Sequence, residues 1–314
     1  MRVDVHHHAI FPRYAERLAE IGVLAQPGIP LPAWAPADSI AMMDRLGIDL
    51  AVLSVGSPGF FWGDQALATD LCRETNDALR DTVAARPDRF RAFVALPLPG
   101  VDDALAELDR VAGDEAFVGA GLLTNYGGRY LGDPAFDPLL AALDARGAVV
   151  HVHPQLPAHY PAAEIDLRPS LIEYVFDSTR AIVNLMLAGV PDRFPEIRWV
   201  FSHCGGTAPY LAGRLAIAEP LPELAHVGPA GIYGNLRRFF YDFALASTPF
   251  SLGAVRQLVG DGQLLVGSDF PFVDESTVAG VLTEAAQVLG EPALDAVARG
   301  NPARLFPSLA RSER

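Results

Sequence analysis

Short apolar runs rich in β-branched residues alternate along this chain with longer segments in which apolar residues recur every three or four positions. The first pattern is typical of buried strands, and the second is typical of amphipathic helices. Together they predict eight strands, at residues 3–7, 50–55, 90–95, 119–124, 148–153, 197–202, 238–243 and 263–267. Helices are predicted at residues 38–46, 65–86, 101–111, 137–145, 170–188, 208–218, 251–258 and 278–289.

This alternation of strand and helix predicts the α/β class, because parallel strands are joined by helical crossovers. Eight such units suggest a (β/α)8 TIM barrel, which typically takes about 250 residues plus insertions. The chain has 314 residues, 50% of them hydrophobic, and we predict one domain over residues 1–314. The long connections at residues 9–37, 154–169 and 219–237 predict loop insertions, at least the first two of them at the mouth where this fold forms its active sites.

The composition excludes several classes of function. The net charge is −14 without an acidic tail, which argues against nucleic-acid binding. No apolar run is long and uncharged enough to span a membrane, and the start of the chain has no apolar signal segment. Two cysteines, Cys72 and Cys204, favour a reduced, cytoplasmic setting. Every basic residue other than histidine is arginine, so lysine-dependent Schiff-base chemistry is excluded.

The first predicted strand ends in three histidines, His6, His7 and His8. Side chains alternate along a strand, so His6 and His8 share one face and His7 lies on the other. Two imidazoles on one face can bind one divalent metal. A histidine triplet near a terminus can instead be the remnant of a tag, but this triplet lies inside the apolar strand pattern.

Three further polar residues, His153, His203 and Asp269, stand at the ends of other predicted strands. The carboxyl ends of all barrel strands meet at one mouth, so these side chains should converge with the histidines of the first strand. Such a nitrogen-rich set favours Zn²⁺ or another transition metal over Ca²⁺ or Mg²⁺. One strand-end histidine is more often structural, so the metal hypothesis depends on the whole set. We expect His151, deeper in the barrel, to be hydrogen-bonded and not a ligand.

The same strand ends resemble the amidohydrolase superfamily, in its branch of metal-dependent non-oxidative decarboxylases. The motifs that carry the resemblance lie at residues 4–8, 152–154, 202–206 and 267–272, with supporting matches at 73–77, 87–90, 241–242 and 300–306. The His-x-His start is similar to that of aminocarboxymuconate-semialdehyde decarboxylase, whereas resorcylate-type enzymes have Glu first. The stretches 123–134 and 176–181 are most similar to 6-methylsalicylate decarboxylases.

The resemblance implies a role for each of these residues. It implies a bound divalent metal, with Zn²⁺ favoured and Mn²⁺ possible, whose ligands would be His6, His8, His153 and Asp269. His203 would act as an acid or base near the metal. Arg214 would reach the site of a neighbouring subunit and bind substrate carboxylate there, which implies a homodimer.

The activity implied by the resemblance is release of CO2 from a small aromatic (salicylate-type) or unsaturated carboxylic acid. Asp269 is the first candidate to protonate the ring carbon. Trp34, Tyr126 and Phe272 are expected to provide apolar walls for the ring. One alternative is a metal-dependent hydrolase of a lactone, ester or amide, and another is a metal-binding protein without activity. The absence of a lysine to bridge two metals argues against the first, and the full ligand set argues against the second.

Overall fold

The computed structural model describes residues 1–26, 29–158, 160 and 166–309. Within them, one sheet of eight parallel strands has the order β1 (Val3–His8), β4 (Leu50–Ser54), β5 (Phe90–Ala95), β6 (Phe117–Leu123), β9 (Val149–His153), β10 (Arg198–Phe201), β11 (Phe240–Asp242) and β12 (Leu264–Leu265). The N–H of Val5 donates to the carbonyl of Val266 at 2.9 Å, which joins the last strand to the first. These bonds confirm the predicted (β/α)8 barrel.

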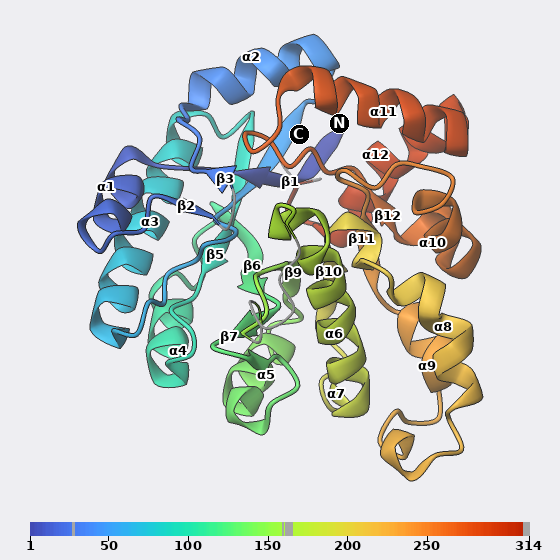
Figure 1. Ribbon diagram of the computed structural model, residues 1–314. Helices are drawn as coiled ribbons and strands as arrows, with labels where there is room; N and C mark the ends of the chain where they lie inside the picture. The colour runs from blue at the N-terminus through green and yellow to red at the C-terminus, as the bar shows by residue number, and fades with distance from the viewer. Residues whose placement is uncertain (27–28, 159, 161–165, 310–314) are drawn as a thin grey trace.

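The predicted helices surround the strands (Figure 1). They are α2 (Pro36–Leu46), α3 (Gln65–Ala85), α4 (Val101–Arg110), α5 (Asp137–Asp144), α6 (Glu173–Leu187), α8 (Ala208–Ile217), α10 (Leu252–Val259) and α11 (Glu275–Leu289). Helices α2 and α11 lie side by side where the ring of helices closes (Figure 1). The bounds agree with the sequence prediction to within a few residues, because the apolar stripe of each helix faces the sheet.

The pattern did not predict several shorter or interrupted elements. These are α1 (Pro12–Glu20), α7 (Val190–Arg193), α9 (Gly231–Leu236), α12 (Glu291–Leu305) and the strands β2 (Ala25–Gln26), β3 (Ile29–Pro30), β7 (Asn125–Tyr126) and β8 (Arg129–Tyr130). Single 3-10 turns occur at Pro134–Phe136, Pro169–Leu171, His203–Gly205, Pro222–Leu224 and Asp261–Gln263. Part of the long connection at residues 154–169 lies outside the described residues.

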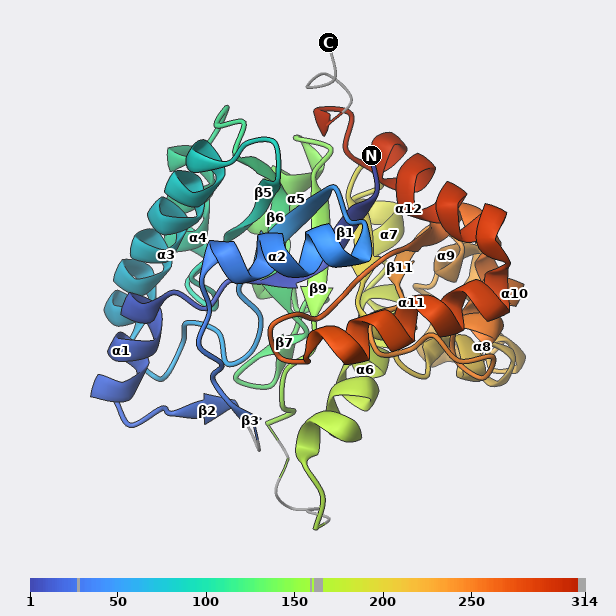
Figure 2. The ribbon, with the colours of Figure 1, turned by 90° about the horizontal axis from the view of Figure 1, so that it is seen from above.

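The strands are continuous apolar runs in the sequence because they are buried on both faces. All six residues of β1 are buried, because one face of the strand lines the barrel interior and the other is covered by helices. The N-terminus and the end of α12 lie at one end of the barrel, and α1, β2, β3 and the start of α6 lie at the opposite end (Figure 2). The latter is the end at which the strands finish. Among the described residues, no helix has the length and apolar character needed to cross a membrane.

Candidate metal centre

His6, His8 and Asp269 place three possible ligand atoms at the spacing of a metal's coordination sphere. The Nε2 atoms of His6 and His8 lie 3.1 Å apart. Oδ1 of Asp269 lies 3.0 Å from Nε2 of His8 and 3.4 Å from Nε2 of His6. Around a metal with bonds of about 2.1 Å, neighbouring ligand atoms are separated by about 3.0–3.4 Å. The three atoms therefore fit one divalent ion.

His153 and His203 complete the cluster. One nitrogen of each lies within 4.8 Å of the possible ligand atoms of His6 and Asp269. The ring centroid of His6 is 5.2 Å from that of His153 and 5.0 Å from that of His203. All five residues predicted to form the site are thus brought together. The structure places His203 close enough to be a ligand itself, so its position alone does not separate a ligand from an acid–base residue.

Backbone carbonyls fix the orientation of two of these imidazoles. Nδ1 of His153 lies 2.8 Å from the carbonyl oxygen of Pro154, and Nδ1 of His203 lies 2.7 Å from that of Ala244. A carbonyl can only accept, so each Nδ1 carries the proton and each Nε2 keeps a free lone pair. Both rings are therefore in the tautomer that suits metal binding or proton acceptance at Nε2.

Asp242, at the end of β11, organises the floor of the cluster. Its carboxylate lies 3.1 Å from Nδ1 of His6 and 3.1 Å from Nε2 of His151. It also accepts the backbone N–H groups of His203 at 3.3 Å and Ala244 at 3.1 Å. His151 is therefore hydrogen-bonded below the cluster, as expected. From sequence, Asp242 falls within the motif at residues 241–242 without a predicted role, although its position at a strand end was the available signal.

Burial and the two carboxylates set the charge of the cluster. Burial lowers the pKa of His8 to about 4 and holds that of His153 well below its usual value. Burial also acts against the charged form of His6, but Asp242 and Asp269 outweigh it and raise the pKa of His6 to about 10. Burial disfavours both carboxylates, yet the surrounding histidines lower their pKa values. At neutral pH the cluster therefore holds a proton on His6, between two carboxylates and beside the neutral imidazoles of His8 and His153. A metal cation can replace this proton.

Comparison with known proteins shows which family the sequence matches. The family model described as amidohydrolase matches residues 3–308. The chain is 33% identical to the decarboxylase yanB of Aspergillus niger, over 98% of this chain and 87% of that protein. It is 32% identical to the 6-methylsalicylic acid decarboxylase acuB of Aspergillus aculeatus, over 100% of this chain and 98% of that protein.

This chain belongs to the amidohydrolase family.

Solved structures agree with the fold of this amidohydrolase. The crystal structure of an amidohydrolase II superimposes with a TM-score of 0.92 at 26% identity, over 98% of this chain and 100% of that one. A dihydroxybenzoic acid decarboxylase from Polaromonas, solved with bound manganese and 2-nitroresorcinol, superimposes with a TM-score of 0.84 at 22% identity, over 99% and 98% of the chains. The latter identity is low, so that likeness shows the fold alone.

Two of the predicted site residues of this amidohydrolase, His203 and Asp269, lie on a strained backbone. His203 has φ 51° and Asp269 has φ 59°, both in the left-handed region. Such a conformation costs about 1–3 kcal/mol for a residue with a side chain and persists only where the surroundings hold it. The N–H of Asp269 donates to the carbonyl of His6 at 2.8 Å, and that of Phe272 donates to the carbonyl of Asp269 at 3.0 Å. These bonds hold the turn that presents Asp269 to the histidines.

Of the residues predicted to contact substrate, Phe272 lies beside the cluster. Its ring centroid is 5.1 Å from that of His8, with the rings edge to face. Trp34 is buried, and its Nε1–H donates to the hydroxyl of Ser39 at 2.8 Å. Tyr126 is also buried, and its oxygen accepts a backbone N–H at 2.9 Å. The contact of each of these aromatic residues with substrate stays a prediction.

Arg214 lies on α8 and is exposed. Among the described residues, no acceptor contacts its guanidinium group. Its contact with substrate depends on a neighbouring subunit and stays a prediction.

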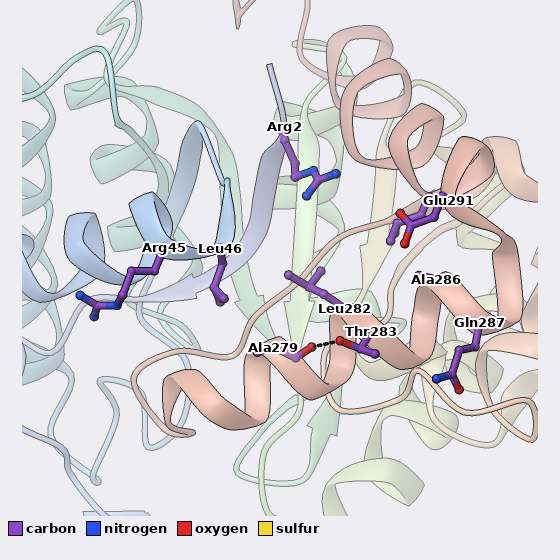
Figure 3. A pocket seen from close by; sticks show the side chains of 10 residues that line it. Arg2, Arg45, Leu46, Ala279, Leu282, Thr283, Ala286, Gln287 and Glu291 are labelled. Carbon is purple, nitrogen blue, oxygen red and sulfur yellow. Dashed lines mark hydrogen bonds between the residues drawn. The ribbon is translucent and has the colours of Figure 1, made fainter.

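A cleft of about 490 Å³ lies elsewhere, on the outside of the barrel between α2, α11 and α12 (Figure 3). Its walls include Arg2, Leu282, Thr283 and Glu291. None of the side chains that line it is a candidate ligand or catalytic residue. The chemistry of the donor set, and not the size of this cleft, therefore locates the site inside the barrel mouth.

Proposed function

We propose that this amidohydrolase is a metal-dependent, non-oxidative decarboxylase that releases CO2 from a small aromatic acid of the salicylate type. The observation that carries the proposal is the cluster of four imidazoles and one carboxylate at the carboxyl ends of the strands. Its support comes from relatives named as decarboxylases, which match the chain over nearly its whole length. Fold alone would not carry this conclusion, because barrels of this kind host many reactions.

The proposed metal is a divalent ion held by His6, His8, His153 and Asp269. Zn²⁺ is favoured because three of these four ligands are nitrogens, and Mn²⁺ is the second candidate. When bound, the metal would act as a Lewis acid and a template for the substrate carboxylate and an ortho phenolic oxygen. The neutral imidazoles of His8 and His153 and the ionised carboxylate of Asp269 suit a cation, whereas His6 must lose a proton when the metal binds.

Two side chains would move protons. His203 has a free lone pair at Nε2, because its Nδ1–H is held by the carbonyl of Ala244. It would accept a proton from an acidic group of the substrate. Burial would raise the pKa of Asp269, but hydrogen bonds with His6 and His8 lower it, so Asp269 starts as a carboxylate. It would gain, by way of His203, the proton that leaves the substrate, and would pass that proton to the ring carbon as CO2 departs.

The proposed partner, apart from substrate, is a second copy of this chain. Tyr210 and Ile217 on α8 are each 84% exposed. They lie four residues before and three residues after Arg214, so all three share one helix face. This face is suited to a second subunit, in which Arg214 would bind substrate carboxylate. A cytoplasmic location and a single domain over residues 1–314 are parts of the same proposal.

The dimer is tested by mixing two inactive variants. Arg214→Ala and His203→Asn should each be inactive alone, and a mixture of the two should regain up to about a quarter of wild-type activity. The gain would come from mixed dimers in which one site has both residues intact. An active Arg214→Ala protein, or a monomer by light scattering, would remove the partner from the proposal.

The reaction is tested by CO2 release from 6-methylsalicylate and related hydroxybenzoates with the metal-loaded protein, with His203→Asn as the control. A panel of lactones, esters and amides is run in parallel. Turnover of a hydroxybenzoate that is lost in the control supports decarboxylation. Hydrolysis of the panel without CO2 release would assign the same site to the hydrolase alternative.

A further inference from the structure

Two sequence stretches that contribute no side chain to the candidate metal centre, residues 123–134 and 176–181, contact each other in the structure. Asp177, on α6, is buried and accepts hydrogen bonds from the hydroxyl of Thr124, the side-chain amide of Asn125 at 2.8 Å and the hydroxyl of Tyr130 at 2.6 Å. The last three residues lie at the end of β6 and in the β7–β8 hairpin. Asp177 therefore fixes the first turns of α6 over the mouth of the barrel.

This tether positions Tyr174, three residues earlier on the same helix. Residues three apart lie on one helix face, so Tyr174 follows Asp177 toward the mouth. The ring of Tyr174 stands edge to face with that of His153, with 6.3 Å between centroids. Its hydroxyl donates to Oγ of Ser57 at 2.8 Å, and both residues are buried. The pair thus bridges α6 and the loop after β4 beside a proposed ligand.

Ser57 is itself close to the cluster. Its backbone N–H lies 3.4 Å from Nδ1 of His153. A serine hydroxyl can accept and donate at once. Oγ of Ser57 accepts from Tyr174, and among the described hydrogen bonds its own proton is given to no protein acceptor.

We propose that Tyr174 and Ser57 form the wall of the substrate site beside His153 and determine which ring substituents the enzyme accepts. The inference rests on the proposed function. Phe272 provides an apolar surface beside His8, whereas the Tyr174–Ser57 pair provides a polar one. A buried hydroxyl pair favours an oxygen substituent on the substrate ring and disfavours a methyl group, which would leave the hydroxyl without a partner.

The test compares two acids that differ in one substituent, 6-methylsalicylate and 2,6-dihydroxybenzoate. The kcat/KM ratio of the methyl to the hydroxyl acid should rise about fivefold to tenfold in Tyr174→Phe and in Ser57→Ala. The double variant should shift the ratio no further than either single variant, because both remove the same hydrogen-bonded pair. Binding of the product phenols, 3-methylphenol and resorcinol, should change in the same direction by calorimetry.

Tyr14→Phe is the matched control. The Tyr14 hydroxyl is also buried and donates to the carbonyl of Gly59 at 2.7 Å, two residues after Ser57 in the same loop. Its loss should leave the ratio unchanged. A ratio that stays constant in the Tyr174 and Ser57 variants, or that moves as far in the control, overturns the inference while decarboxylation stands. If wild type converts neither these acids nor other hydroxybenzoates, the proposed function is wrong and the inference fails with it.

Discussion

Asp4 and Ser268 join the first strand of the barrel to the turn that follows the last strand. The carboxylate of Asp4, on β1, accepts the hydroxyl of Ser268 at 2.6 Å and its backbone N–H at 3.0 Å. The same carboxylate lies 2.9 Å from Nδ1 of His7, whose Nε2 lies 2.7 Å from the hydroxyl of Ser39 on α2. His7 thus faces the outer helices, as the strand pattern predicts. Through Ser268, Asp4 also holds the turn that carries Asp269.

Asp4→Asn should weaken metal binding about 10- to 100-fold, because the residues that orient ligands matter nearly as much as the ligands. An amide has one oxygen where Asp4 uses two. The Oδ2 contacts with His7 and the hydroxyl of Ser268 and the Oδ1 bond from the N–H of Ser268 therefore cannot all remain. Metal affinity is measured by competition with a chromogenic chelator. Asp88→Asn, at an exposed pair with Arg86, serves as the control and should bind metal as wild type does. Equal affinity for both variants would contradict the role given to Asp4.

Gly56→Ala should disrupt the cluster although it replaces none of the proposed ligands. A Cβ at residue 56 would lie 2.7 Å from Cε1 of His8 and 3.0 Å from Nδ1 of His153, so both rings would have to move. We expect a loss of metal affinity of at least tenfold. Gly280→Ala, within α11, has open space around the new Cβ and should raise stability by about 0.5–1 kcal/mol. Normal metal content in Gly56→Ala would show that the rings tolerate the methyl group.

His203→Asn separates an acid–base residue from a ligand. If His203 moves protons, the variant keeps its metal and loses about 10²- to 10⁴-fold in kcat. Metal content by elemental analysis and kcat on the active hydroxybenzoate are measured on the same preparation. A variant that has lost its metal would instead make His203 a ligand, as its distance to the cluster allows.

Metal affinity should rise with pH through the neutral range. The pKa of His6 in the metal-free protein is raised to about 10, so a proton occupies the cluster at pH 7 and must leave when metal binds. Below this pKa, each pH unit should change affinity by up to about tenfold, with weaker binding at lower pH. Calorimetry in buffers of different ionisation enthalpy should report about one proton released per metal. Release of no proton would mean that the cluster is already deprotonated.

The sequence predicts which side chains gather at the mouth of the barrel, because each of them obeys a local rule. His6 and His8 follow from the alternation of a strand, and His153, His203 and Asp269 follow from strand ends that meet at one mouth. These rules need no knowledge of which strands are neighbours.

The same local rules do not predict residues whose hydrogen-bond partners are distant in the sequence. Asp4 and Tyr174 depend on partners far away in the chain, and no periodic pattern reports such a pairing. Helix α12 was missed because Gly300 and Pro302 lie inside it and both residues usually end helices. In the structure, Asn301 between them donates to the carbonyls of Asp261 and Leu264, which anchors this turn.

Closure of the barrel between β1 and residues 266–270 also sets the order of events during synthesis. A ribosome makes His6 and His8 about 260 residues before Asp269 and its turn. Until then the first strand has no neighbour on its open edge, and the Nε2 atoms of its two histidines lack the carboxylate of Asp269. Assembly of the complete cluster must therefore follow synthesis of residue 269, and a chain truncated before residue 266 would lack both the contact between β1 and residues 266–270 and the carboxylate of Asp269.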